Sequence, residues 1–571
     1  MAFGVWNRLA SCPEAFIGWG KPRLPKARGA IATVLFCTAL VVAVDGRGFV
    51  HGFFRQDDFS FLAVARSPKG LGEQMHLYHN DHLYPLYRLE VWALVRVAGA
   101  AATVRELSIV FNLANFLSCT GLLIAGCWML HEIGASRMVA FLAALMIWMW
   151  PGWGEFTAGY YTLSAYVQVQ ALTFCAAASM LRGFRKGSNG WLASSLLLVT
   201  AAIGMNISGA SSFACLFAIA TAVLLGRPER RKKLYLVLLA AVFVAVCGLY
   251  LGVLKHAYSP RELVQNPTGQ PAGPEMIQFA LHHPIAVART AVSAPGGLIM
   301  NGLTPTFLQI LSDRGSLAPA LRRSLVLMEL LVAIAAAIYV GWRLSRVPAQ
   351  KRFLIVAMAA CAGISLALVV VARTSYAIST PATLWYPKYM LMPVCWLWMA
   401  IALFADSAYF SVPGYLRAPG VLYAGAALGI WLTASYALWE RTLIPGSVAY
   451  APRGRWGNVE NSLERRAHYE AVIGDLKAIA AAAGSSTVCL PDQALWRSDF
   501  YDQHSVLEWG SDWTPKGVTY LFWDLLAADP GVGIKGRWVS EAEMTPRLHA
   551  ALSSCPWIGP GLRRASAQRT R

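Results

Sequence analysis

A series of about eleven long apolar runs determines what this chain can fold into. Most runs are about 16 to 24 residues long, the length that an α-helix needs to cross roughly 30 Å of hydrocarbon at about 1.5 Å per residue. Because 56% of the 571 residues are hydrophobic and only 14% are charged, lipid must be the main solvent of the chain. The sequence therefore predicts a polytopic α-helical membrane protein with about 11 transmembrane helices.

The predicted spans are separated by connections of very different length. The third and fifth spans are short, so the number of crossings can change by one or two. The spans are Gly29 to Val44, Leu107 to Leu130, Met138 to Trp150, Tyr161 to Leu181, Gly190 to Met205, Gly209 to Gly226, Leu234 to Leu254, Ser324 to Trp342, Phe353 to Ala372, Tyr389 to Ala405 and Pro419 to Leu438.

Basic residues gather in every second connection. These connections, together with the basic segment 1–28, hold 19 of the 49 Lys and Arg against four acidic residues, an excess that marks the cytoplasmic side. The N-terminus is therefore predicted in the cytoplasm and 29–438 as the transmembrane domain. The outer loops 45–106 and 255–323 and the tail 439–571 fall on the extracytoplasmic side. Topology thus explains most of the net charge of +19, and no nucleic-acid partner is expected.

The tail after the last span has a soluble character. Apolar residues recur at intervals of three and four from Val459 to Ala483, which predicts a helix. Ser486 to Leu490 and Gly517 to Trp523 read as short strands. These elements predict a small α/β domain outside the membrane.

The second large outer loop and the span after it each hold an unusual feature. The weakly apolar stretch Ile285 to Ile310 is broken by Pro295 and by glycines, so it is expected to lie at the interface or to re-enter without crossing. In the eighth span, Glu329 is either directed into a polar cavity or hydrogen-bonded in a structural role. The sequence leaves both readings of Glu329 open.

The first outer loop brings two adjacent carboxylates, Asp57 and Asp58, about a dozen residues after the first span. Neighbouring carboxylates repel, and on a helix they point about 100° apart. They are expected to divide the work, one facing a substrate and the other a metal, a backbone amide or a basic residue. The alternative is that both cap a helix at Phe59 to Ala65, and spacing alone favours this alternative slightly.

A polar stretch, MHLYHNDHLYPLYRLE, follows in the same loop and contains His76, His79, Asp81, His82 and Arg88. Three histidines and an aspartate could bind a transition metal, but their spacing matches no standard zinc site. A polar ligand or a lipid headgroup is therefore the expected partner of this stretch.

Further polar groups are predicted on the same face of the membrane. Glu155 lies in the turn after the third span, and Arg373, Lys388 and Tyr389 flank the loop before the tenth. Cationic side chains at span ends commonly extend toward the headgroups. Their alternative use is to bind a lipid phosphate.

This combination of features resembles the GT-C superfamily of polytopic, polyprenyl-phosphate-sugar-dependent glycosyltransferases. The motifs that carry the resemblance are QDDF at Gln56 to Phe59, HNDHLYPLYRL at His79 to Leu89, and YPKYMLMP at Tyr386 to Pro393. The last motif is similar to the Arg-Tyr and Pro pattern of a late outer loop in that superfamily, with Lys388 standing where Arg is commoner.

The resemblance implies sugar transfer from a lipid-linked donor to a hydroxyl of a glycan, lipid or protein acceptor at the outer face. Asp57 would be the general base and Asp58 its partner, with the order reversible. Arg373 and Lys388 would bind the phosphate, and the His79 to Arg88 stretch would help to shape the cavity. Members of the superfamily differ in metal dependence, so a divalent Mg²⁺ or Mn²⁺ ion is compatible with the resemblance.

Two other classes of protein stay open at this point. A transporter or flippase of lipid-linked glycans would also be polytopic, but transporters often place ionisable residues near the midplane in repeated halves. Here the charges cluster at one rim and no repeat is found, which favours an enzyme. A non-catalytic membrane assembly subunit is the second alternative.

Overall fold

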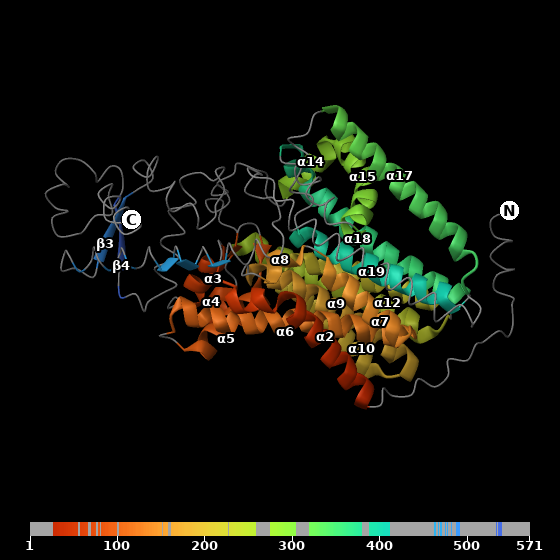
Figure 1. Cartoon of the computed structure of the whole chain (residues 1–571), viewed down its shortest axis with the longest axis horizontal. Coiled ribbons are helices and arrows are strands. Elements are labelled where there is room, and N and C mark those ends of the chain that lie inside the picture. The colour runs from red at the N-terminus through yellow and green to blue at the C-terminus, as the bar shows by residue number, and fades with distance from the viewer. Residues whose placement is uncertain are drawn as a thin grey trace.

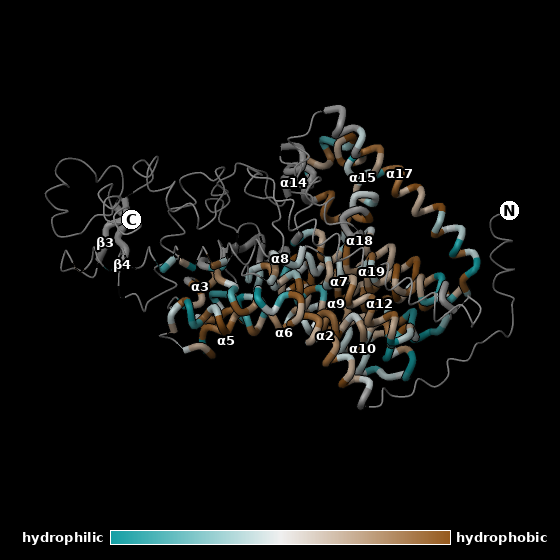
Figure 2. The backbone as a smooth tube through the Cα atoms, in the orientation of Figure 1, coloured by the Kyte–Doolittle hydropathy of each residue, from teal (hydrophilic) through white to brown (hydrophobic). Residues whose placement is uncertain are grey.

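Helices make up most of the structure, a computed structural model (Figure 1). Because the apolar residues lie along these helices, most of the bundle is hydrophobic (Figure 2). The residues that the structure describes are 27–54, 57–66, 70–75, 78–79, 82–99, 102–150, 152–157, 161–226, 228–257, 274–303, 319–379, 387–410, single residues between 462 and 481, 487–491, 533 and 535–539.

Within the described residues, eight helices are long and apolar enough to cross a membrane. They are α2 (Ala27–His51), α6 (Val104–Ile133), α9 (Ser164–Lys186) with the preceding 3₁₀ turn η1 (Tyr161–Leu163), α11 (Ala210–Gly226) with η2 (Ile207–Gly209), α12 (Arg230–Ala257), α17 (Pro319–Leu344), α18 (Ala349–Ser379) and α19 (Pro387–Phe410). Two shorter apolar helices are α7 (Arg137–Met149) and α10 (Asn189–Met205).

The predicted polytopic helical fold is confirmed. The first ten predicted spans coincide with these ten helices, and α7 and α10 are the two that were expected to be short. The eleventh, Pro419 to Leu438, lies outside the described residues, so the number of crossings stays a prediction. The helices differ in length. α6 has 30 residues, whereas α7 has only 13, fewer than the roughly 20 that a full crossing needs.

The first outer loop folds into short elements above the ends of the spans. They are α3 (Asp57–Arg66), α4 (Leu71–Met75), α5 (Pro85–Ala98) and a two-stranded antiparallel pair, β1 (Tyr78–His79) with β2 (His82–Leu83). Pro85 occupies the first turn of α5, where its missing N–H is not needed. A capping box between Thr103 and Glu106 then starts α6.

The second outer loop contains two helices, α14 (Pro274–His282) and α15 (Pro284–Leu303). The expected break at Pro295 is wrong, because α15 continues through it. Close packing explains this difference: a Cβ atom at Gly296 would lie 1.7 Å from the carbonyl oxygen of Glu329 in α17, so only glycine lets the two backbones approach this closely. The side chain of Glu329 is fully buried at this crossing and does not face lipid.

The described part of the C-terminal tail includes a parallel strand pair. β3 (Thr487–Pro491) pairs with β4 (Lys535–Val539). β3 overlaps the predicted strand Ser486 to Leu490, while Gly517 to Trp523 lies outside the described residues. The α/β domain as a whole therefore stays a prediction.

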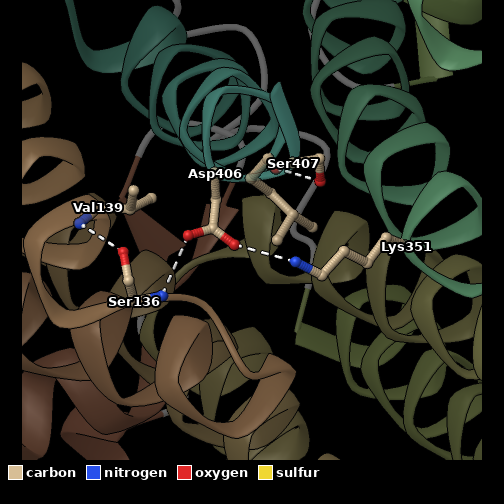
Figure 3. Close-up of polar contacts among 6 residues, drawn as sticks. Ser136, Val139, Lys351, Asp406 and Ser407 are labelled. Atoms are coloured by element: carbon tan, nitrogen blue, oxygen red, sulfur yellow. Dashed lines mark hydrogen bonds and ion pairs between the residues drawn. The ribbon is translucent and has the colours of Figure 1, made fainter. Parts of the chain in front are cut away.

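A buried aspartate joins three helices (Figure 3). Its partner Ser136 follows the end of α6, whereas the start of α6 adjoins the first outer loop, so this is the opposite end of the bundle. The Asp406 side chain of α19 is fully buried. One of its oxygens accepts a hydrogen bond from the backbone N–H of Ser136 at 3.3 Å, and the other lies 3.1 Å from Nζ of Lys351 in α18. Because Ser136 caps α7, this one carboxylate ties together the ends of α7, α18 and α19.

A second buried carboxylate, Glu132 near the end of α6, lies at the same end of the bundle. It pairs with Arg182 at 3.5 Å and with Arg185, both near the end of α9, and it accepts a hydrogen bond from Nε1 of Trp128 at 3.0 Å. These ion pairs join acidic and basic residues of different connections. The sequence predicted that these connections lie on the same side of the membrane. This arrangement agrees with the predicted alternation of the spans, whereas the cytoplasmic assignment of that face stays a prediction.

Asp406→Ala should lower the free energy of unfolding by about 1 to 3 kcal/mol, because the substitution leaves a backbone N–H without its acceptor and removes the partner of Lys351. Glu470→Gln is the control, since Glu470 is exposed and pairs with Arg466 at 3.1 Å, and an ion pair at the surface contributes little. Denaturant unfolding in mixed micelles measures both. Equal stability of Asp406→Ala and wild type would contradict the structural role of Asp406.

Candidate functional site

The carboxylate of Asp58 binds the start of another helix. Asp58 is 2% exposed. Its oxygens accept hydrogen bonds from the backbone N–H of Tyr161 at 3.1 Å, the backbone N–H of Thr162 at 2.7 Å and the hydroxyl of Thr162 at 2.7 Å. The first N–H groups of a helix have no partner inside it, so a negatively charged oxygen there is strongly favoured. Asp58 thus fastens α3 to η1 and the outer end of α9.

Asp57 is the first residue of α3. The two aspartates therefore both lie in the first turn of that helix, and the Asp58 carboxylate caps η1 across the loop. Adjacent positions on a helix diverge by about 100°. The side chain of Asp57 lies outside the described residues, and its role stays a prediction.

The segment before the aspartates is held by an asparagine of α6. Nδ2 of Asn112 donates to the carbonyl oxygen of Gly52 at 3.0 Å, and Oδ1 of Asn112 accepts from the hydroxyl of Tyr161 at 2.5 Å. A Cβ atom at position 52 would lie 2.3 Å from that Oδ1, so glycine is required for the approach. One side chain thereby ties the end of α2 to both α6 and η1.

An aromatic cluster fills the space beneath these polar contacts. The ring of Phe54 lies 5.3 Å from Phe111 and 4.8 Å from Tyr161, and Phe61 lies 5.1 Å from Tyr87. All five side chains are buried. Edge-to-face aromatic pairs at such distances add about 0.5 to 1.5 kcal/mol each beyond their burial, so this cluster stabilises the position of α3.

Helix α5 contributes two buried residues next to Asp58. Burial, and then the nearby Asp58 carboxylate, raise the pKa of the Tyr87 hydroxyl well above its ordinary value, and the hydroxyl contacts Thr162 and Ser164. The guanidinium of Arg88 lies 4.8 Å from the centre of the Phe61 ring. Burial lowers the pKa of Arg88 to about 10, so it stays positively charged at neutral pH. Arg88, a predicted substrate-binding residue, thus packs under α3.

Glu90, two residues after Arg88 in α5, was not singled out as a site residue from the sequence. Its Oε1 accepts a hydrogen bond from Nε2 of Gln168 in α9 at 2.6 Å, and the same Nε2 lies 3.1 Å from the hydroxyl of Ser118 in α6. Burial raises the pKa of Glu90 to about 7. A carboxylate two residues after a motif arginine was the available signal, but nothing in the sequence indicated its burial.

Two of the three histidines of the polar stretch are neighbours across the strand pair. His79 and His82 are register partners in β1 and β2, although their side chains lie outside the described residues. Within the described residues, no group of three or more His, Cys, Asp or Glu is arranged to hold a metal ion. The divalent ion therefore stays a prediction.

The remaining predicted site residues lie on three helices. Glu155 lies in α8 (Trp153–Thr157), and Asn115 of α6 holds this helix by donating to the carbonyl oxygen of Phe156 at 2.5 Å. Arg373 lies in the last two turns of α18. The side chains of Glu155 and Arg373 lie outside the described residues.

Lys388 and Tyr389 begin α19 and are both half-buried. Nζ of Lys388 lies 5.1 Å from the centre of the Tyr389 ring. One turn later, Met392 belongs to the same buried cluster as Phe54 and Tyr161. The start of α19 therefore adjoins the elements that Asp58 fastens.

Comparison with solved structures finds proteins with a similar chain path. No family model and no curated protein matches the chain. The crystal structure of ArnT from Cupriavidus metallidurans bound to undecaprenyl phosphate is similar, with a TM-score of 0.39 and 15% sequence identity over 89% of this chain and 76% of that chain. At this identity and TM-score, the likeness carries no conclusion about the fold or the activity of this chain.

Asp58→Ala should lower the free energy of unfolding by about 2 to 4 kcal/mol, because it leaves two buried N–H groups and one hydroxyl without an acceptor. Asp58→Asn keeps one acceptor oxygen and should lose clearly less. Denaturant unfolding of the purified protein measures the difference. An Asp58→Ala protein as stable as Asp58→Asn would show that the contacts to η1 contribute nothing.

The raised pKa of Glu90 predicts a stability that depends on pH. The folded protein holds this proton more tightly than the unfolded chain, whose Glu titrates near 4.5, so the contribution is complete below about pH 4.5 and is lost as pH rises through about 7. Glu90→Gln removes this loss. The melting temperature of Glu90→Gln minus that of wild type should therefore increase from pH 5 to pH 8.

Glu73→Gln on α4 provides the control, since Glu73 is an exposed acid in the same loop. A difference between Glu90→Gln and wild type that stays constant from pH 5 to pH 8 would show that Glu90 titrates at the same pH in both states.

Proposed function

We propose that this chain is a membrane glycosyltransferase that moves a sugar from a polyprenyl-phosphate donor to a hydroxyl of a glycan, lipid or protein acceptor. The reaction takes place on the extracytoplasmic side, where the first outer loop is located. Asp57 is the general base. Asp58 is the residue that fixes the base in place.

One observation carries this proposal most directly: the Asp58 carboxylate is occupied by three hydrogen-bond donors of η1. A carboxylate that accepts three hydrogen bonds is a poor base, because these bonds favour its ionised form. Asp57, the adjacent residue, is attached to this point through the backbone of α3, and adjacent positions on a helix diverge by about 100°. This division of roles favours Asp57 over Asp58 as the group that receives the proton.

The chemistry follows from the charges that develop. The acceptor oxygen attacks the anomeric carbon, its proton passes to Asp57, and the bond from the anomeric carbon to the phosphate oxygen breaks with its electron pair on the phosphate. Lys388 and Arg373 stabilise that phosphate by their positive charge. A divalent Mg²⁺ or Mn²⁺ ion, if bound, would supply further positive charge there.

The position of the site suits a donor dissolved in the membrane. The outer ends of α6, α9 and α19 surround the cluster beneath Asp58, and each of these helices is long enough to span a bilayer. The phosphate of a prenyl lipid lies at the headgroup level, the same level as the outer ends of the spans. The donor can therefore approach from the lipid while the acceptor approaches from water.

Asp57→Asn should reduce transfer of a radiolabelled sugar from a polyprenyl-phosphate donor by at least about a hundred-fold, because the amide cannot accept the proton. Its melting temperature should stay near that of wild type, because Asp57 is not the residue that binds η1. The assay uses purified protein in detergent, with and without EDTA. The EDTA arm shows whether a divalent ion takes part.

Asp58→Asn is the matched variant, with the same change one residue away. We expect it to lose both stability and activity, in contrast to Asp57→Asn. Full transfer activity in both variants would exclude a catalytic role for the pair. Uptake of a lipid-linked glycan into vesicles without bond formation would identify a transporter instead.

A further inference from the structure

The tail after the last predicted span returns to the first outer loop. Its described residues between 462 and 481 are helical, in agreement with the predicted helix Val459 to Ala483. Ser462 is 0% and Tyr469 is 5% exposed, whereas Leu463 and Glu470, the residues that follow each of them, are exposed. Positions seven apart lie on one face of a helix. One face of this segment is therefore covered by the rest of the protein.

The residue that Tyr469 contacts is Phe53, just before the aspartates. The two ring centres are 5.4 Å apart, and Phe53 is 1% exposed. Tyr469 belongs to the same buried cluster as Phe54, Phe61 and Tyr161. Figure 1 shows the described part of this segment, in light blue, beside α3.

The contact between Tyr469 and Phe53 adds to the contacts that hold the segment carrying Asp57. Gly52 is held by Asn112, and Phe54 packs on Tyr161. On the other side of Asp57, Asp58 is fastened to η1. Phe53 lies between Gly52 and Phe54, and the tail holds it through Tyr469.

We propose that Tyr469 is a positioning residue of the candidate active site and that the tail is required for catalysis. By packing on Phe53, Tyr469 holds the segment 52–58 so that Asp57 meets the acceptor hydroxyl in a productive geometry. This inference rests on the proposed function. It adds that the active site is complete only when the tail is docked on the first outer loop.

The expected size of the effect follows from the geometry that a general base needs. A base must be within about 2.6 to 3.2 Å of the oxygen whose proton it takes. Displacement by about 1 Å can reduce the rate about a hundred-fold. Loss of the Tyr469 ring loosens the segment without removing the base, so an intermediate loss of about ten- to a hundred-fold is expected, mainly in kcat.

The experiment compares three variants of the full-length protein in detergent. Tyr469→Ala removes the ring, Tyr469→Phe keeps it, and Glu470→Ala changes the next, exposed residue, which pairs with Arg466 at 3.1 Å on the same helix. Sugar transfer gives kcat and the KM for the acceptor. Hydrogen–deuterium exchange of the peptide covering 52–66 reports the order of the segment without any reference to activity.

We expect Tyr469→Ala to speed exchange in 52–66 and to lower kcat, and we expect Tyr469→Phe and Glu470→Ala to match wild type in both. Unchanged exchange in Tyr469→Ala would overturn the contact, and faster exchange with unchanged kcat would overturn the positioning role. If wild type transfers no sugar, the proposed function fails and the positioning of Asp57 for transfer falls with it. The exchange data then still decide whether the tail orders the loop.

Discussion

The bond between the Asp58 carboxylate and the first backbone amides of η1 fixes the outer end of this protein. A helix that begins at the edge of the bilayer exposes N–H groups that lipid cannot satisfy. Asp58 satisfies two of them and also accepts the hydroxyl of Thr162. Because Asp58 lies in α3, the same bond places α3, and with it Asp57, directly on the end of α9. Stability at the helix start and geometry at the candidate site therefore depend on one carboxylate.

The two ends of the bundle use acidic residues in different ways. At the end opposite the first outer loop, Glu132 and Asp406 neutralise Arg182, Arg185 and Lys351, so the buried charges there are paired. At the outer end, Asp58 binds backbone groups, and Glu90 binds an amide side chain and has its pKa raised to about 7 by burial. Ionisable groups with a perturbed pKa are typical of functional sites. The raised pKa of Glu90 thus distinguishes the outer end as the one that can carry chemistry.

Much of the fold follows from the sequence because lipid imposes a simple rule on helix length. Ten of the predicted spans coincide with helices, and the alternation of basic connections agrees with the ion pairs of Glu132 and Asp406. The course of α15 through Pro295 could not be predicted, since it depends on packing against the backbone at Glu329. Local breaking signals were outweighed there by a contact between helices that are separate in the sequence.

The candidate site was predictable only in part. The adjacent aspartates and their divergence could be derived from the sequence, but the partners of Asp58 in η1 lie about a hundred residues further along the chain. The hydrogen bond of Asn112 could not be predicted either. Asn112 lies in a strongly apolar run, where an asparagine does not interrupt a predicted span. Only the structure shows that it binds Gly52.

Two side chains of the spans hold the first outer loop. Asn112 of α6 binds Gly52, and Gln168 of α9 binds Glu90 of α5. The loop therefore cannot move far without moving helices that lipid holds in place. The proposed donor, dissolved in the same lipid, would meet a loop whose depth is set by the spans. The proposed acceptor in water has no such constraint, so a site that orients it needs a contribution from outside the membrane.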